Sequence, residues 1–242
     1  MVVDQEFVNS AYDRLSKDYT TISKRRSRYI SSVNGLISDF INGPSLLDIG
    51  SGDGSRLPFL QNIPSVSNIC CMEPSIEMFR LLSINSSIYS VNTPAQLFIP
   101  RFENSFDSIT MLWNVLGHIP CEHDLFLSLA NVFSYLKPGG YLILDCHNRH
   151  NASQYGYFTV LYRLGIDLLN FKRSRGDVSS TLVNDTVSVS SYGHLFTPRE
   201  LTNLLFSANF SVVTHKFVNY DTGRISCLFT QGHHFVVAKK IA

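Results

Sequence analysis

The stretch "LLDIGSGDGS", residues 46–55, places three glycines at alternate positions directly after an apolar run. The apolar run predicts a buried strand, which Asp48 and Ile49 end. Glycines that follow such a strand accept positive φ and let a ligand approach the backbone without a Cβ atom in the way. A strand, a tight turn and the start of a helix together indicate a nucleotide-binding turn at the edge of a doubly wound α/β sheet.

Apolar strands alternate with helical patterns on both sides of this turn. Strands are expected at 45–49, 67–72, 87–91, 106–112 and 141–146, and helices near 55–61, 75–84, 94–98 and 122–136. In "KPGG", residues 137–140, proline cannot continue the preceding helix, and the glycines turn the chain into the strand at 141. This repetition predicts a mostly parallel sheet that is covered by helices on both faces.

The remaining segments predict a single domain in four parts. Residues 1–43 contain two helices and form an N-terminal cover, 45–150 form the cofactor-binding core, 151–195 form an inserted substrate cap, and 196–242 form a C-terminal helix and two closing strands. The C-terminal helix carries a capping box, with Thr197 as N-cap, Pro198 at the first helical position and Glu200 at the third. The closing strands are expected at 210–218 and 233–240.

Composition excludes several functional classes. The 242 residues carry 20 basic and 19 acidic side chains, so that no basic field favours nucleic acid. No apolar run is long enough for a membrane span, and the first residues do not resemble a signal peptide. Five cysteines without a C-x-x-C spacing indicate reduced thiols in a cytoplasmic protein. No metal site is expected, because the closing-strand histidines His215, His233 and His234 have no carboxylate at metal-ligand spacing. A monomer and a homodimer both remain open.

Electrostatics distinguishes two cofactors for the turn. Glu73 ends the second strand about twenty residues downstream, where a carboxylate can accept hydrogen bonds from both ribose hydroxyls. A pyrophosphate dinucleotide requires a sixth-position glycine, but this sequence has Ser55 there. Asp48 and Asp53 would repel a pyrophosphate and attract a cationic sulfonium with its amino group. The pattern therefore favours S-adenosylmethionine, and a nicotinamide-dependent oxidoreductase is the alternative.

Five motifs in order resemble the class I S-adenosylmethionine-dependent methyltransferases. They are "LLDIGSGDGS", "MEPSIEM", "TPAQLFI", "FDSITMLWNVLGHIP" and "YLKPGGYLILDCHNR", which together cover about residues 45–150. The resemblance implies a Rossmann-like sheet of seven strands in the order 3-2-1-4-5-7-6, with the seventh strand antiparallel. It also implies S-adenosylmethionine as the cofactor.

The resemblance assigns cofactor contacts residue by residue. Glu73 is expected at the ribose, and Gln96, in place of the family's usual acid, at the adenine amine. Asp48 either orders the turn or reaches the methionine amino group through water. An N-terminal arginine, Arg25 or its rival Arg26, is expected at the carboxylate. The predicted cofactor-binding set is Tyr19, Arg25, Asp48, Gly50, Ser51, Gly52, Glu73, Pro74, Met78, Ala95, Gln96, Trp113 and Asn114.

The sequence gives fewer signals for the residues that bind the methyl acceptor and catalyse the transfer. His118 and His147 are candidate catalytic bases, because an unperturbed imidazole titrates near 6.5. Tyr12, Asn148, Tyr192 and His194 are expected to contact the substrate. The residues after the fourth strand read "LWNV", without the N-P-P-Y or D-P-P-Y motif of base methylases, so the sequence favours methyl transfer to a nitrogen or oxygen of a small molecule. A relative that binds the cofactor without catalysis is a further alternative.

Overall fold

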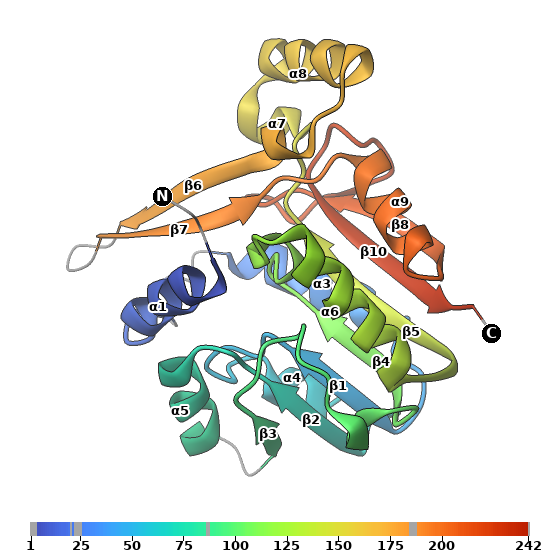
Figure 1. Ribbon diagram of the computed structural model, residues 1–242. Coiled ribbons are helices and arrows are strands. Elements are labelled where there is room, and N and C mark those ends of the chain that lie inside the picture. Colours follow the sequence, from blue (N-terminus) through green and yellow to red (C-terminus); the bar gives the residue numbers. More distant parts are fainter. Residues whose placement is uncertain (1–3, 20, 22–25, 86–87, 184–187, 242) are drawn as a thin grey trace.

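The computed structural model describes residues 4–19, 21, 26–85, 88–183 and 188–241. Its centre is a sheet whose strands are ordered β3-β2-β1-β4-β5-β10-β8-β9 (Figure 1). These strands are β1 (Ser45–Ile49), β2 (Asn68–Met72), β3 (Tyr89–Val91), β4 (Phe106–Met111), β5 (Leu136–Cys146), β8 (Phe210–Val218), β9 (Ile225–Ser226) and β10 (His233–Lys240).

Strand directions confirm the predicted class I fold. β1 pairs in parallel with β2 and β4, β3 pairs in parallel with β2, and β5 pairs in parallel with β4. β10 is antiparallel to both β5 and β8, so it occupies the place of the family's seventh strand, and β8 occupies that of the sixth. The short β9 adds an eighth, unpredicted strand at the edge next to β8.

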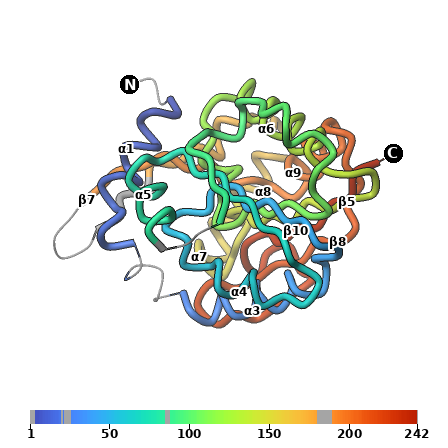
Figure 2. Tube along the Cα trace, turned by 90° about the horizontal axis from the view of Figure 1, so that it is seen from below, coloured from blue at the N-terminus to red at the C-terminus, as the bar shows by residue number. Residues whose placement is uncertain are grey.

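Helices lie on both faces of this sheet (Figures 1 and 2). They are α1 (Gln5–Leu15), α3 (Ser27–Ser38), α4 (Leu57–Gln61), α5 (Ile76–Asn85), α6 (Glu122–Tyr135), α7 (Ala152–Tyr155), α8 (Tyr157–Leu169) and α9 (Pro198–Ser207). Successive strand residues alternate between two buried cores: Leu46 packs with α3 and α4, whereas Leu47 packs with α6 and α9. This alternation is expected of a sheet that is covered on both faces.

Two local predictions are wrong. Residues 94–98 are a turn and not a helix, because the backbone bends at 95–97 and a short 3-10 helix follows at Pro100–Phe102. The "KPGG" segment is not a separate turn before the strand, since β5 already begins at Leu136 and pairs with Phe106. The proline and glycines are accommodated by a register shift, and Gly139 has φ +77°.

The segment after β5 forms α7, α8 and a hairpin of β6 (Asp177–Val183) and β7 (Ser188–His194). Figure 1 shows α8 and the hairpin beyond one end of the sheet, with α1 beside β7. The predicted capping box at Thr197 and Glu200 is formed. In the described part of the chain, no helix combines the length and the apolar character needed to cross a bilayer.

Candidate active site

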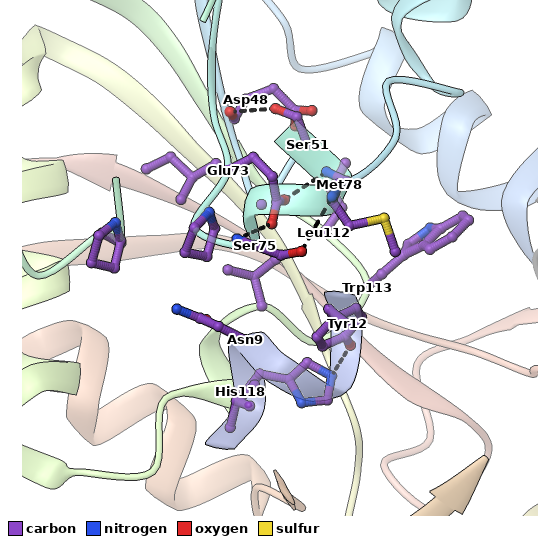
Figure 3. A pocket seen from close by; sticks show the side chains of 18 of the residues that line it. Asn9, Tyr12, Asp48, Ser51, Glu73, Ser75, Met78, Leu112, Trp113 and His118 are labelled. Carbon is purple, nitrogen blue, oxygen red and sulfur yellow. Dashed lines mark hydrogen bonds between the residues drawn. The ribbon is translucent and has the colours of Figure 1, made fainter. Parts of the chain in front are cut away.

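A cavity lies at the carboxyl ends of β1, β2 and β4, with α1 over it (Figure 3). Its empty volume is about 930 Å³, open solvent at its mouth included. The sequence-predicted residues that line it are Tyr12, Tyr19, Asp48, Gly50, Ser51, Gly52, Glu73, Pro74, Met78, Ala95, Gln96, Trp113 and His118. The structure thus brings together most of the predicted cofactor set, although it spans about a hundred residues of sequence.

The glycine turn has the conformation that its sequence requires. Gly50 has φ +73°, and a Cβ atom there would lie 2.4 Å from a methyl carbon of Val115. Gly52 has φ +59°, and a Cβ atom there would meet only the ring of Tyr19, at 3.6 Å. The first glycine is therefore needed for packing under the turn, and the second keeps the backbone open toward the cavity.

Glu73 is the central acid of the cavity. Its side chain accepts hydrogen bonds from the backbone N–H groups of Gly52, at 2.8 Å, and Ser75, at 2.9 Å. Burial raises the pKa of Glu73 to about 7, although these two hydrogen bonds oppose the increase. A carboxylate has about four acceptor positions, so both oxygens can still receive hydroxyl donors from a ligand.

The second acid of the turn is held by the neighbouring strand. Asp48 accepts a hydrogen bond of 2.6 Å from the hydroxyl of Thr110 on β4, and burial raises its pKa. The hydroxyl of Ser51 donates to the Asp48 carbonyl at 2.8 Å. The Ser51 side chain therefore orders the turn, and Asp48 both orders it and lines the cavity.

Arg56 is a lining residue that sequence reasoning missed. Its guanidinium lies 5.0 Å from the centre of the Trp113 ring. Both terminal nitrogens are buried, and no hydrogen-bond partner exists for them among the described residues. The charge of Arg56 opposes the increase that burial causes in the pKa of Asp48 and Asp145, but its terminal N–H groups have no acceptor among the described residues, and leaving buried donors unpaired is costly. The signal was a basic residue two positions after the last glycine of the turn.

The sequence predicts Arg25 at the carboxylate of the cofactor. This residue lies outside the described residues, so its position cannot be compared with that of Arg56. Its rival Arg26 stacks on the rings of Trp113, at 5.9 Å, and Tyr220, at 5.0 Å.

The turn after β4 is strained and is held by one buried acid. Trp113 and Asn114 have φ values of +67° and +63°, which non-glycine residues rarely adopt. Asp145 on β5 accepts hydrogen bonds from both of their N–H groups and, at 2.9 Å, from the hydroxyl of Tyr29. This turn presents Trp113 to the cavity, whereas the Asn114 side chain accepts a hydrogen bond from the N–H of His147 at 2.9 Å.

Helix α1 is fixed to the loop that carries Glu73. The carboxylate of Asp13 accepts hydrogen bonds from the Ser75 hydroxyl, at 2.6 Å, and from the backbone N–H of Glu77, at 3.0 Å. These donors lie at the N-terminus of α5, where a negative charge is favourable. The contact connects the helix over the cavity directly to the Glu73 loop, and sequence reasoning missed it.

Tyr12 and His118 form a hydrogen-bonded pair that lines the same cavity (Figure 3). His118 Nδ1 lies 2.7 Å from the carbonyl of Tyr192, and Nε2 lies 2.8 Å from the Tyr12 hydroxyl. Since a carbonyl only accepts, Nδ1 carries the proton and Nε2 accepts from Tyr12. Burial lowers the pKa of His118, which favours the neutral ring.

Five other predicted residues do not line this cavity. Asn148 is fully buried and donates to the carbonyls of Phe229 and Gly232, and His147 packs against the ring of His233 at 4.7 Å. His194 lies between the carboxylates of Asp177, at 2.7 Å, and Glu200, at 2.9 Å.

In Tyr192, the hydroxyl bonds to Asp177, and only its carbonyl contacts His118. The side chain of Asn114 faces the end of β5, as described above. These contacts lie within the protein, at the strand ends and the hairpin, and residue type alone does not distinguish them from substrate contacts.

Comparisons with known proteins agree with this geometry. Residues 21–215 match the family model described as "Methyltransferase domain". An uncharacterized protein of Methanocaldococcus jannaschii is 26% identical over 141 residues, which are 58% of this chain and 52% of that protein. Cypemycin N-terminal methyltransferase of a Streptomyces species is 25% identical over 130 residues, which are 52% of each chain. The chain thus spans about half the length of the curated relatives it matches.

A solved structure of similar fold is the 1,6-didemethyltoxoflavin-N1-methyltransferase of Burkholderia thailandensis, which contains bound 1,6-didemethyltoxoflavin and S-adenosylhomocysteine. It has a TM-score of 0.65 at 15% identity, and the match covers 100% of this chain and 92% of that chain. The family match over most of the sequence, the strand order and the glycine turn lead to one conclusion. This chain belongs to the methyltransferase-domain family, and its fold is that of the class I S-adenosylmethionine-dependent methyltransferases.

Proposed function

We propose that this protein transfers the methyl group of S-adenosylmethionine to a nitrogen or oxygen of a small-molecule acceptor. The observation that carries the proposal is Glu73, a buried carboxylate that the glycine turn and α1 enclose in the cavity. Its remaining acceptor positions suit the two hydroxyls of a ribose. The cofactor, when bound, supplies an electrophilic methyl group on a positively charged sulfur.

Other residues of the cavity fit the rest of this cofactor. Pro74, Met78, Ala95 and Gln96 line the cavity, and an adenine is proposed to lie against them, where the Gln96 amide oxygen can accept from its amine. The terminal N–H groups of Arg56, which have no acceptor among the described residues, suit the carboxylate of the methionine part, and the nearby Asp48 suits its amino group. The proposed arrangement therefore places an opposite charge of the protein beside the carboxylate and beside the amino group of the cofactor.

The acceptor is proposed to bind between this cofactor site and α1. Gln5, Val8 and Asn9 of α1 line that side of the cavity together with Ile119. The mixture of apolar and amide side chains, and enclosure by a helix, favour a small molecule. The names of the Streptomyces and Burkholderia proteins describe an N-terminal and an N1 methyltransferase, which supports a nitrogen acceptor.

Tyr12 and His118 are proposed to remove the acceptor's proton. The Tyr12 oxygen can accept a hydrogen bond from the acceptor while its own O–H donates to His118 Nε2. As the acceptor is methylated, its proton moves to Tyr12, and the Tyr12 proton moves to His118. The neutral ring is ready for this step because its pKa is lowered and its tautomer is fixed by Tyr192.

Isothermal calorimetry with S-adenosylhomocysteine, and separately with NAD, tests the cofactor. We expect saturable binding of the former and none of the latter; selective NAD binding would overturn the proposal. Incubation of small-molecule extracts with methyl-labelled cofactor, with Glu73→Ala as the blank, tests the acceptor. A labelled low-mass product that forms with the wild type and not with Glu73→Ala supports the proposal. Label that appears only in macromolecules contradicts a small-molecule acceptor.

A further inference from the structure

Helix α8 presents its apolar side to solvent and its charged side to the protein. Tyr157, Phe158, Leu161, Tyr162, Leu168 and Leu169 are 64–92% exposed. The only buried residue of the helix is Val160. A surface helix of a globular protein normally has the opposite arrangement, with its apolar stripe toward the core.

The exposed residues form one continuous face. At about 100° per residue, the six exposed side chains lie within an arc of about 140° that is centred near Gly165. Val160, Arg163 and Asp167 lie on the opposite side. We call the six side chains and Gly165 the α8 face, and Figure 1 shows α8 at an extremity of the molecule, away from the central sheet.

Ion pairs prevent the helix from rolling this face inward. Asp167 contacts Arg149 Nε at 2.8 Å and His150 Nε2 at 3.0 Å, and all three side chains are nearly buried. Arg163 donates to the carbonyl of Arg149 at 2.9 Å. Turning the apolar side toward the protein would expose or separate these charges, so the outward orientation is fixed by the fold.

The α8 face is too large to be ordinary surface. A whole aromatic side chain covers about 150–250 Å², so the exposed parts of Tyr157, Phe158 and Tyr162 amount to roughly 450 Å². With the three leucines the apolar surface approaches the roughly 800 Å² that each partner buries in a standard interface. The largest apolar patch of a typical monomer is about 300–600 Å².

We propose that the α8 face is a homodimer interface, in which α8 packs against α8 of a second copy of this chain. A two-fold contact requires a self-complementary surface. Leu161 and Tyr162 precede Gly165 by four and three positions, and Leu168 and Leu169 follow it by three and four positions. Two antiparallel copies crossing at Gly165 therefore oppose apolar residues along their length.

The position of Gly165 supports this occupant. A glycine inside a helix destabilises it relative to alanine, and a Cβ atom at Gly165 would meet nothing within 4 Å in the single chain. Because Gly165 has no Cβ atom, the backbone of a second helix can approach it closely, and this contact would offset the loss of helix stability. The other candidate occupant is an anionic membrane surface, which is bound by helices that carry many Lys and Arg residues beside the apolar face. The one basic residue of α8, Arg163, faces inward.

Sedimentation equilibrium of the wild type and of Phe158→Glu/Leu169→Glu tests the proposal. The matched control is Ile84→Glu/Phe206→Glu, because these side chains are also exposed, by 79% and 73%, but lie on α5 and α9. We expect the wild type and the control to be dimers at micromolar concentration. The α8 variant should dissociate at least about 100-fold more readily. A monomeric wild type, or an unchanged dimer in the α8 variant, would overturn the proposal.

Gly165→Gln separates association from folding. Glutamine favours a helix more than glycine does. At concentrations low enough to give monomers, the unfolding temperature of the variant should therefore equal or exceed that of the wild type. The dimer should nevertheless weaken, because the longer side chain separates the two helices. Sedimentation with vesicles of neutral and of anionic lipid tests the membrane as the alternative partner. If the wild type binds vesicles and Phe158→Glu/Leu169→Glu does not, the α8 face binds a membrane and the dimer proposal is overturned.

Discussion

Helix α1 buries its apolar face, whereas helix α8 buries its charged face. α1 buries Val8, Ala11 and Leu15 and uses Asp13 to reach the Glu73 loop. α8 packs the Asp167 side chain against Arg149 and leaves six of its apolar residues exposed. The first helix completes a cavity, and the second presents a surface. Amphipathic spacing therefore predicts that a helix forms, but the charged residues that it meets decide which side is buried.

The largest expected effect concerns the acid that α1 helps to enclose. Glu73→Ala should weaken binding of S-adenosylhomocysteine by at least about 100-fold, since hydrogen bonds to a charged group contribute about 1.5–3 kcal/mol each. Calorimetry measures the loss, and thermal unfolding of the variant shows whether the fold is retained. If a folded Glu73→Ala protein binds the cofactor product as well as the wild type, the ribose assignment is wrong.

The chemical role of α1 predicts the next effect. Tyr12→Phe removes the hydroxyl between the acceptor and His118, so the rate of methyl transfer should fall by about 100-fold. Cofactor affinity should change little, because the ring remains. An acceptor-saturated rate assay beside calorimetry separates the two quantities. Equal rates for Tyr12→Phe and the wild type would show that the pair only shapes the cavity.

Asp13 attaches α1 to the Glu73 loop, and Asp167 attaches α8 to Arg149, so substitutions of these two acids compare the two helices directly. Asp13→Asn weakens the contact of α1 with the Glu73 loop, and cofactor affinity should fall about 10-fold with a small loss of stability. Asp167→Asn removes the charge opposite Arg149, and the free energy of unfolding should fall by about 2 kcal/mol.

Cofactor affinity should remain unchanged in the Asp167→Asn variant, because none of its partners lines the cavity. Calorimetry and urea unfolding of both variants measure these effects. Loss of cofactor affinity in Asp167→Asn would contradict the separation of the two regions.

The same difference explains how far the sequence could be interpreted. The cofactor half depends on local signals: a glycine turn, an acid about twenty residues later, and a strand order that the motifs imply. Most of the cofactor residues that these signals predict line the cavity, whereas the expected helix at 94–98 and the turn at 137–140 are not formed. In the other half, Asn148 and His194 have residue types that suit a substrate site, but long-range partners at 229–232 and at Asp177 and Glu200 use their polar atoms. Such partners are not visible in local spacing.

Arg56 predicts a smaller and more selective effect. Arg56→Gln should weaken S-adenosylhomocysteine binding about 10-fold, which corresponds to about 1.4 kcal/mol for one partly solvated ion pair. Methylthioadenosine lacks the amino and carboxyl groups, so its affinity should not change. Arg56→Lys keeps the positive charge, so its affinity for S-adenosylhomocysteine should lie between those of the wild type and Arg56→Gln. An equal loss for both ligands would show that Arg56 only supports Trp113.

The smallest effect is the dependence of cofactor binding on pH. Because burial raises the pKa of Glu73 from 4.5 to about 7, the folded protein binds more protons than the unfolded chain between these values. The free energy of unfolding therefore falls as the pH rises through this range. Ribose hydroxyls donate to the ionised carboxylate, so cofactor affinity should instead rise with pH, by less than about 10-fold per unit below 7, and level off above it.

Asp13 and Asp48 also face Glu73 and contribute to its raised pKa. Calorimetry of the wild type and of Glu73→Gln across this range isolates the contribution of Glu73, since glutamine does not titrate. A flat profile in the variant and a rising one in the wild type are expected. Parallel profiles would assign the titration to Asp48, and would move the acid that senses the cofactor from the end of β2 to the end of β1.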